Sequence, residues 1–344
     1  MISTIDGEII ESLSDDLVDY NDNLNATFIA NCKSAYAQIC FLTAWDYDKI
    51  PFILTTDQHS RIYENRLTGI YRMLDDIVDW QRISKVINLG DVSTDAVISD
   101  FRQFDKCYKL LPLDKQVNVW GNHDYGNDST FDQQYLKQYF NSGNMRRGGG
   151  NGYFCVYDDD FNAKYLVWNN LEHIGEQNRN NKMTTHQVNW IIEELTKNDG
   201  YDIIICSHWF LDCRNRYAYD EGRWYYPYDR PDEPFLTDST VEADFLQMIA
   251  DRKNKTSGSF TDDEGVTHSY DFSDCESELL TQLSGHDHID NYKHIEDSIT
   301  EISYDCAKYR NTIYFCYIDR KAKEYHAIKV WGTYNNLYID LDIN

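Results

Sequence analysis

The sequence lacks several features that would assign it to common classes of protein. No window approaches the ~18 consecutive apolar residues of a membrane-spanning helix. The first residues, MISTIDGEIIESLSDD, lack the basic and apolar runs of a secretory signal. The nine cysteines form no pairs at metal-ligand spacing, and most lie in apolar context, as in DIIICSH and IYFCYI. We therefore expect reduced thiols in the core of a cytoplasmic protein without membrane association.

Positive charge is also scarce. The chain has 32 Lys and Arg against 58 Asp and Glu, which gives a formal net charge of −26. Such a chain repels nucleic-acid backbones, which proteins bind through patches of Lys and Arg, so nucleic acid is disfavoured as a partner. An anionic small substrate is still compatible with this charge, because bound divalent metals can reverse the potential locally.

The apolar residues that are present favour one large α/β domain. The chain has 344 residues, of which 42% are hydrophobic. Apolar runs at 52–55, 85–89 and 116–120 alternate with helical periodicity over 62–80 and 94–111. This alternation predicts a layered core with parallel strands. Later segments predict a hairpin at 152–171, helices at 184–198 and 240–252, and C-terminal strands at 296–303, 311–319 and 324–332.

The domain organisation that we expect has two parts. Residues 1–50 form a helical N-terminal extension packed on the main domain, with apolar positions compatible with one or two helices over 8–36. Residues 51–344 form the main domain, which carries an aromatic-rich insertion at about 209–268. No internal repeat or linker interrupts it.

Each expected strand in the core ends in polar residues. In open α/β sheets, ligands bind beyond the carboxyl ends of the parallel strands, so these residues predict one shared site. Two further apolar runs, DIIICSH and ELLTQLSGHDH, end in the same way. The polar residues at the five strand ends are Asp57, His59, Asp91, Asn122, His123, Asp124, His208, His286 and His288.

The chemistry of this set indicates metal binding. Asp57 and His59 are two residues apart on an extended segment, so both project to the same side and could bind one ion. Asp91 offers two carboxylate oxygens, which is enough to bridge two metals. His286 and His288 share the same spacing and could serve two different metals. Nitrogen and oxygen ligands without a thiolate suit two divalent ions such as Mn, Fe, Zn or Ni.

The ordered set D-x-H, G-D, G-N-H-D, H and G-H-x-H resembles the motifs of the calcineurin-like metallophosphoesterase superfamily, and in particular its GNHD group. The segment QVNWIIEEL also resembles the Gln-x-x-Trp-Leu helix of many members. The resemblance implies an α/β fold of four layers, in which two mixed β-sheets pack as a sandwich flanked by helices.

The resemblance also implies a role for each motif residue. The first metal would be bound by Asp57, His59, Asp91 and His288. The second metal would be bound by Asp91, Asn122, His208 and His286, so that Asp91 bridges the two ions. His123 would be the non-ligand histidine that protonates the leaving group or stabilises charge in the transition state. The sequence leaves open whether Asp124 or Asp95 supports His123.

The function implied is hydrolysis of a phosphomonoester or phosphodiester by a metal-bridging hydroxide. The substrate would be a phosphorylated small molecule or a nucleotide. The Tyr ligand of the purple acid phosphatase branch is missing from GDVSTD, and Trp120 replaces the Arg that precedes GNH in the protein phosphatase branch. Two alternatives stay open: a nuclease of the same superfamily, and a non-catalytic scaffold or virion-associated protein. The sequence does not indicate the oligomeric state.

The insertion at 209–268 is our candidate for substrate recognition. Its front half places tyrosines and a tryptophan among arginines, which could stack on an aryl group or base and hold phosphate oxygens. The alternative is a loop packed on the domain, its arginines paired with Asp220, Glu221 and Asp229. The candidate substrate-binding residues are Arg214, Arg216, Arg223 and Trp224.

Overall fold

The computed structural model describes residues 4–5, 8–9, 24–44, 46–59, 64–94, 96, 100–101, 104–105, 108–125, 152–169, 184–209, 218–220, 223–225, 240–262, 265–286, 288, 290–294, 300–304, 312–332 and 337–343. Within these ranges, only the backbone is described for 4–5, 8–9, 64–68, 125, 218–220, 223–225, 240–244, 291–294, 300–301, 303, 337 and 342. No helix in this part of the chain is long and apolar enough to cross a membrane.

The first of two six-stranded sheets contains the strands that the sequence predicted for the start of the domain. Its order is β18 (Leu337–Asp342), β17 (Glu324–Trp331), β16 (Thr312–Asp319), β3 (Lys49–Thr55), β4 (Lys85–Asn88) and β5 (Gln116–Asn118). Strands β3, β4 and β5 are parallel, whereas the pairs of β16 with β3, β16 with β17 and β17 with β18 are antiparallel. The carboxyl ends of the three parallel strands therefore meet at one edge.

The second sheet is also mixed. Its order is β14 (Asn291–His294), β15 (Thr300–Ser303), β13 (Leu279–Ser284), β8 (Asp202–Cys206), β7 (Ala163–Val167) and β6 (Phe154–Asp158). The four central strands, β15, β13, β8 and β7, are parallel. The edge strand β14 pairs antiparallel with β15, and the edge strand β6 pairs antiparallel with β7. Strands β6 and β7 form the hairpin that was expected at 152–171.

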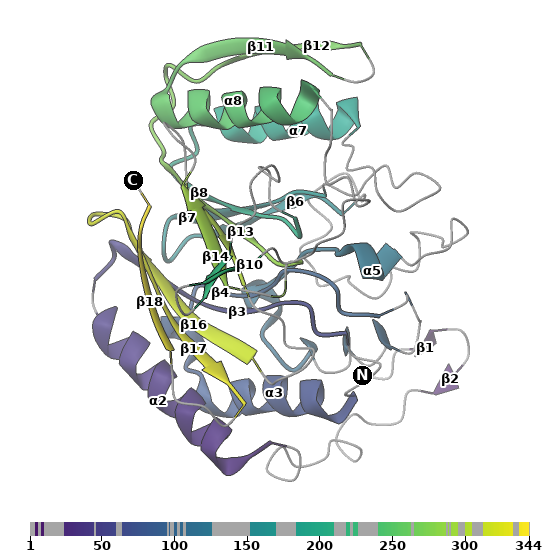
Figure 1. The fold of residues 1–344 in the computed structure, drawn as a ribbon, viewed down its shortest axis with the longest axis vertical. Helices are drawn as coiled ribbons and strands as arrows, with labels where there is room; N and C mark the ends of the chain where they lie inside the picture. The colour runs from purple at the N-terminus through teal and green to yellow at the C-terminus, as the bar shows by residue number, and fades with distance from the viewer. Residues whose placement is uncertain are drawn as a thin grey trace.

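The two sheets pack face to face with helices on both outer faces, which confirms the expected four-layer fold (Figure 1). Helices α2 (Ala26–Leu42) and α3 (Glu64–Ile77) cover the first sheet. Helices α7 (Thr185–Thr196) and α8 (Thr240–Asn254) cover the second. Figure 1 shows a hairpin of β11 (Ser257–Thr261) and β12 (Thr267–Asp271) lying outside α7 and α8.

Apolar side chains hold each pair of layers together. Between the sheets, Phe52 and Leu54 of β3 belong to one buried cluster with Ile204 of β8 and Leu283 of β13. A second cluster joins α2 and α3 to the first sheet, and a third joins α7, α8 and the β11–β12 hairpin to the second sheet. The six described cysteines, Cys32, Cys40, Cys155, Cys206, Cys275 and Cys316, are buried free thiols, as the sequence predicted.

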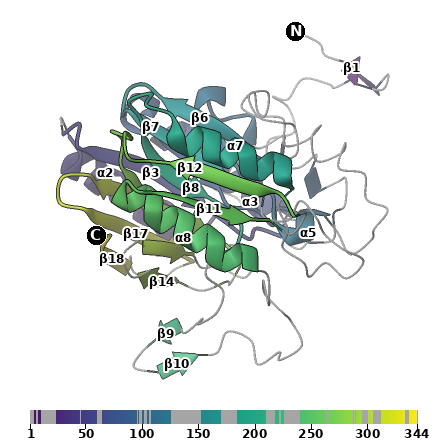
Figure 2. The ribbon, with the colours of Figure 1, turned by 90° about the horizontal axis from the view of Figure 1, so that it is seen from above.

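The structure also contains several shorter elements. They are β1 (Thr4–Ile5), β2 (Glu8–Ile9), η2 (Trp80–Arg82), η3 (Leu113–Lys115), α5 (Asn122–Tyr125), β9 (Ala218–Asp220) and β10 (Arg223–Tyr225). Figure 2 shows β9 and β10, which pair antiparallel, to one side of the two sheets beyond β14.

The N-terminal region differs from the expectation of one or two helices over 8–36. Residues Glu8 and Ile9 form strand β2, which pairs with β1, and the described helix begins only at Ala26. Asn25 caps that helix because its side-chain oxygen accepts a hydrogen bond from the N–H of Thr27 at 2.8 Å. Helix α2 packs on β16 and β17, so it is part of the core. Strands β14 and β18 were not predicted.

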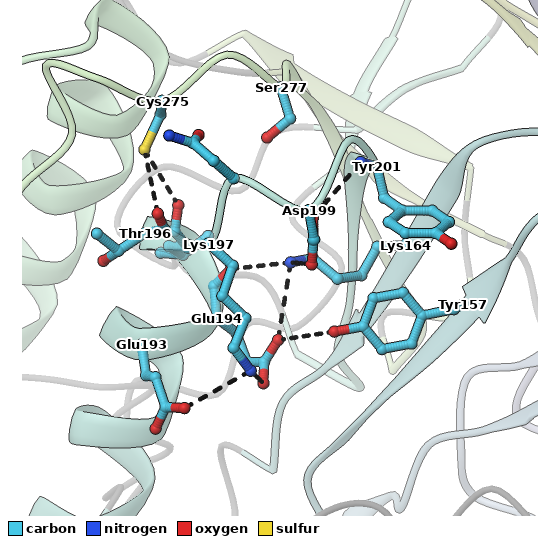
Figure 3. Close-up of polar contacts among 12 residues, drawn as sticks. Tyr157, Lys164, Glu193, Glu194, Thr196, Lys197, Asp199, Tyr201, Cys275 and Ser277 are labelled. Carbon is cyan, nitrogen blue, oxygen red and sulfur yellow. Dashed lines mark hydrogen bonds and ion pairs between the residues drawn. The ribbon is translucent and has the colours of Figure 1, made fainter.

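A buried lysine fastens the C-terminal end of α7 to the second sheet (Figure 3). The Lys164 side chain is fully buried, and its Nζ donates to the carbonyl of Glu194 and to Asp199 Oδ2, both at 2.9 Å. The hydroxyl of Tyr157 donates to Glu194 Oε2 at 3.3 Å. The positive charge is thus balanced by neighbouring carboxylates. These contacts lie before the start of β8, at the opposite end of this strand from His208.

Candidate metal centre

The structure brings the predicted ligands of both sheets together at one edge. Asp57 and His59 follow β3, and Asp91 follows β4; His208 follows β8, and His286 and His288 follow β13. Two groups could each hold a metal ion, because their ligand atoms lie within 4.8 Å of one another. The first group is Asp57, His59, Asp91 and His288, and the second is Asp91, His208 and His286. Asp91 belongs to both groups.

The ligand atoms approach one another closely. Asp57 Oδ1 lies 3.1 Å from His288 Nε2, and Asp91 Oδ2 lies 3.7 Å from His59 Nε2. The other oxygen of Asp91, Oδ1, lies 3.4 Å from His208 Nε2. Asn122, the first residue of α5, adds Oδ1 at 3.1 Å from His208 Nε2. The amide oxygen therefore extends the second group to the four residues that the sequence predicted.

Two motif glycines permit this approach because they have no Cβ. A Cβ on Gly121 would lie 2.1 Å from Asp91 Oδ1 and 2.3 Å from the Asp91 nitrogen. A Cβ on Gly285 would lie 2.1 Å from Thr56 Oγ1 and 2.7 Å from Asp57 Oδ2. Any side chain at either position would push a candidate ligand away. These contacts explain why glycine precedes Asn122 and His286 in the motifs.

The backbone is strained where the candidate ligands lie. Within the described residues, nine non-glycine residues have positive φ, and five of them are candidate ligands. Each such residue costs on the order of 1–3 kcal/mol unless its surroundings impose the conformation. The strain therefore concentrates at this edge of the sandwich. The five are Asp57 (φ 50°), His59 (45°), Asp91 (53°), His286 (70°) and His288 (57°).

The electrostatics of the cluster favour a cation. Burial disfavours ionisation of Asp57 and Asp91, yet His288 and His208 outweigh burial and hold both carboxyl pKa values below the usual range. Burial would lower the pKa of His208, but neighbouring Asp91 outweighs this and raises it. Ionised carboxylates thus favour protonated imidazoles beside them. A divalent ion would replace those protons, so the donor set fits a metal.

Two buried carboxylate oxygens also fit a metal. Asp57 Oδ1 and Asp91 Oδ2 receive no hydrogen bond from the part of the chain that the structure describes. Their partner oxygens are used: Asp57 Oδ2 accepts from Thr56 Oγ1 at 2.6 Å and from the N–H of His286 at 2.9 Å. Each carboxylate is thus held by one oxygen while the other is left for a cation.

His208 is oriented in the way that metal-binding histidines commonly are. Its Nδ1 lies 2.7 Å from the carbonyl oxygen of Leu89. Because a carbonyl only accepts, Nδ1 carries a proton, and once a metal ion replaces any proton on Nε2, that atom offers its lone pair. This lone pair faces Asn122 Oδ1 and Asp91 Oδ1, which are also acceptors. Three acceptors that converge in this way indicate a site for a positive charge.

His123 lies beside the first group, where it is half-buried. Its ring stands edge-on to that of His59, with centroids 4.8 Å apart. Its backbone N–H donates to Asp91 Oδ1 at 2.8 Å. Its Nδ1 lies 2.6 Å from the carbonyl oxygen of Thr94, which can accept its proton. A backbone carbonyl therefore orients this ring and leaves Nε2 available. The role of His123 as an acid stays a prediction.

Asp124 performs a different task from the one considered for it. Its Oδ2 accepts from the N–H groups of Asp91 and Gly121, and its Oδ1 accepts from that of Ser93. Burial, together with the charge of Asp91, raises the pKa of Asp124. Its carboxylate joins the loops after β4 and β5. The rival supporter of His123, Asp95, lies outside the described residues.

The remaining predicted site residues are only partly described. Arg214 and Arg216 lie outside the described residues, and Arg223 and Trp224 belong to β10, of which only the backbone is described. The sequence did not single out Thr56, the carbonyl of Thr94 or the ring of Trp209. No sequence signal identifies a backbone carbonyl as a partner, because every residue has one.

The family of the chain follows from comparison with known proteins. The family model of the calcineurin-like phosphoesterases matches residues 50–290, and the chain belongs to this family. The match begins at the start of β3 and ends just after His288, so it spans every candidate ligand. Comparison with curated protein sequences found no match.

Three solved structures have the same fold. A dimetal phosphatase from Danio rerio is similar with a TM-score of 0.54 and 14% identity, over 84% of this chain and 98% of that one. GAP50, the anchor in the inner membrane complex of Plasmodium, has a TM-score of 0.50 and 11% identity, over 86% and 89%. Purple acid phosphatase PPD1 from yellow lupin has a TM-score of 0.51 and 10% identity, over 85% and 53%.

Proposed function

We propose that this protein hydrolyses a phosphoester of a small molecule or nucleotide with two divalent metal ions. The observation that carries the proposal is the position of Asp91, whose two oxygens face the two candidate groups separately. The first ion would be held by Asp57, His59, Asp91 and His288, and the second by Asp91, Asn122, His208 and His286. When bound, two such ions lower the pKa of a water molecule and clamp phosphate oxygens.

The residues of the chain would supply orientation and a proton. The N–H of His123 holds Asp91 Oδ1, which fixes the shared carboxylate. Because the carbonyl of Thr94 accepts a hydrogen bond from Nδ1–H of His123, Nε2 of the protonated ring is the atom that would give a proton to the leaving oxygen or stabilise its charge. The left-handed backbone at the ligands holds this geometry before a substrate arrives.

A second candidate function is a non-catalytic scaffold. The fold is shared with GAP50, an anchor protein, so this architecture is compatible with a purely structural task. The complete set of candidate ligands favours the hydrolase. A scaffold does not require strained backbone at these residues, or buried carboxylate oxygens that receive no hydrogen bond from the described residues. The net charge of −26 makes a nuclease the weakest of the three hypotheses.

One screen separates these functions. The purified protein, supplied with Mn²⁺, is tested on aryl phosphates, a bis-aryl phosphodiester, cyclic nucleotides and single-stranded DNA. We expect turnover of a small phosphoester that a chelator abolishes and that the Asp91→Asn variant lacks. Cleavage of DNA in preference to small esters would favour the nuclease. Two bound metals without turnover of any substrate would favour the scaffold.

A further inference from the structure

Trp209 contacts two of the residues that we assign to the second metal. Its indole Nε1 donates to Asn122 Oδ1 at 3.2 Å. Its ring stacks on that of His286, with centroids 4.6 Å apart and an interplanar angle of 30°. Trp209 directly follows His208, a third proposed ligand of the same ion. Three ligands from α5 and from the ends of β8 and β13 therefore meet at one tryptophan.

The hydrogen bond determines which end of the Asn122 amide faces the site. An indole N–H can only donate, so the amide atom opposite it must be the oxygen. If the amide were rotated by 180°, its NH₂ group would face both the indole N–H and the metal. Oδ1 has two lone pairs, and the one that Trp209 does not use is available to an ion beside His208 Nε2.

The stacking contact restrains a second ligand. His286 has a left-handed backbone with φ of 70°, and its imidazole belongs to the second candidate group. The indole face lies against the imidazole face, which limits rotation of the ring about its side-chain bonds. Trp209 thus fixes both the amide of Asn122 and the imidazole of His286, although these residues come from different sheets.

Trp209 can act in this way because it is itself held firmly. Its side chain is 5% exposed and belongs to the apolar cluster under α2 and α3. Its carbonyl oxygen accepts from Ser207 Oγ at 2.7 Å and from Gln282 Nε2 at 3.3 Å. Gln282 Nε2 also donates to Ser207 Oγ at 2.7 Å, which ties β13 to the end of β8.

We propose that Trp209 is a positioning residue for the second metal, and this inference rests on the proposed function. Both ligands that it contacts belong to the second group only, so its loss should weaken one ion and spare the other. Removing an outer partner of a metal ligand typically costs about 10–100-fold in metal affinity. Trp209→Phe keeps an aromatic ring beside His286 and removes the N–H donor, together with part of the indole ring.

The test is a titration of chelator-treated protein with Co²⁺, followed by calorimetry and by visible absorption of the bound ion. We expect two sites in the natural protein. In Trp209→Phe, the first site should keep its affinity and the second should weaken by about 10–100-fold, with an altered absorption spectrum. The matched control is Trp168→Phe, since Trp168 is also buried, packs on Phe245, and its Nε1 has no hydrogen-bond partner within the described residues.

A double substitution separates positioning from general packing. If Trp209 acts through the amide, Trp209→Phe should add little further loss at the second site once Asn122 is replaced by Ala. If the natural protein and Trp209→Phe bind Co²⁺ equally at both sites, the positioning role of Trp209 is overturned and the proposed function is not affected. A loss at both sites that follows a fall in melting temperature would overturn that role too. A natural protein that binds no Co²⁺ would overturn the proposed function as well.

Discussion

The two ends of strand β4 bury charge in opposite ways. At its start, Lys85 is 3% exposed and its Nζ lies 3.1 Å from Asp158 Oδ2, so a cation of the chain meets an anion of the chain. Just beyond its other end, Asp91 is 1% exposed and its Oδ2 receives no hydrogen bond from the described residues. Charges that serve the fold are balanced within the chain, whereas those at the candidate metal centre are left for an ion.

The same contrast holds across the second sheet. Lys164 of β7 is fully buried, and Asp199 and Glu194 balance its charge near the start of β8. At the carboxyl end of β8, the two atoms that face His208 Nε2, Asn122 Oδ1 and Asp91 Oδ1, are both acceptors. Buried charge by itself therefore does not mark a site in this protein. The site is distinguished by several buried acceptor atoms that face one another.

The largest effect on metal binding should come from adding a side chain at Gly121. Gly121→Ala places a Cβ 2.1 Å from Asp91 Oδ1, so we expect the shared carboxylate to move and both metals and activity to be lost. The matched control is Gly200→Ala, where the backbone is left-handed with φ of 83° and no atom lies within 4 Å of the new Cβ. This control should cost only about 1–2 kcal/mol of backbone strain and keep the metals. Metal retention in Gly121→Ala would contradict our account of the motif glycine.

His123→Ala should keep the metals and lose activity. If His123 protonates the leaving group, turnover of an alkyl phosphate should fall by about 10²–10⁴-fold. The loss should be smaller for p-nitrophenyl phosphate, because p-nitrophenolate leaves without a proton. Metal analysis and steady-state kinetics on both substrates check this. Equal losses on the two esters would argue against the acid and leave charge stabilisation.

Lys164→Met should affect the fold and spare the site. The substitution takes the cation from Asp199, whereas Glu194 keeps its ion pair with Lys197, so we expect about 3 kcal/mol less stability in denaturant unfolding, the low end for a broken buried pair. Metal content and turnover per folded molecule should not change. The matched control is the exposed Lys321, where Lys321→Met should alter stability little. Lost metal in Lys164→Met would mean that the two ends of the sheet are coupled.

The smallest expected effect is a local loss of stability in the β11–β12 hairpin at acidic pH. Burial opposes ionisation of Asp262, but hydrogen bonds from Thr185, His268 and the N–H of Val266 outweigh it and lower the pKa of Asp262 to about 2. Since the unfolded value is about 3.9, this bonding stabilises the fold above that pH and is lost as the pH falls toward 2. Hydrogen exchange in β11 and β12, taken relative to the intrinsic amide exchange rate at each pH, should accelerate over this window, and Asp262→Asn should flatten the dependence. An unchanged pH profile in that variant would remove Asp262 as the cause.

The sequence predicted the parts that depend on local pattern. Apolar runs ending in Asp57, Asp91 or His208 located the parallel strands, and the motif spacing predicted which residues converge. At the N-terminus it predicted a helix that α2 provides from Ala26, but Glu8 and Ile9, which lie in the same expected segment, pair as β2. Strand β18 was also missed, although it pairs antiparallel with β17, the strand that directly precedes it.

The details of the centre could not be predicted for a related reason. The partner of His123 is a backbone carbonyl, and the task of Asp124 is to accept backbone N–H groups, so neither depends on a recognisable residue pair. The contact of Trp209 with Asn122 joins residues 87 positions apart. Such contacts arise from the way the two sheets pack, which a strand-by-strand interpretation does not reach.

The most direct test is the metal content of the natural protein and of Asp91→Asn, both purified without a chelator and measured by elemental analysis. If Asp91 bridges two ions, the natural protein should contain close to two transition-metal equivalents. Because an amide oxygen is a weaker and uncharged ligand at the shared position, Asp91→Asn should lose most of both. A variant that keeps a full complement of metal would contradict the central claim that one carboxylate serves both groups.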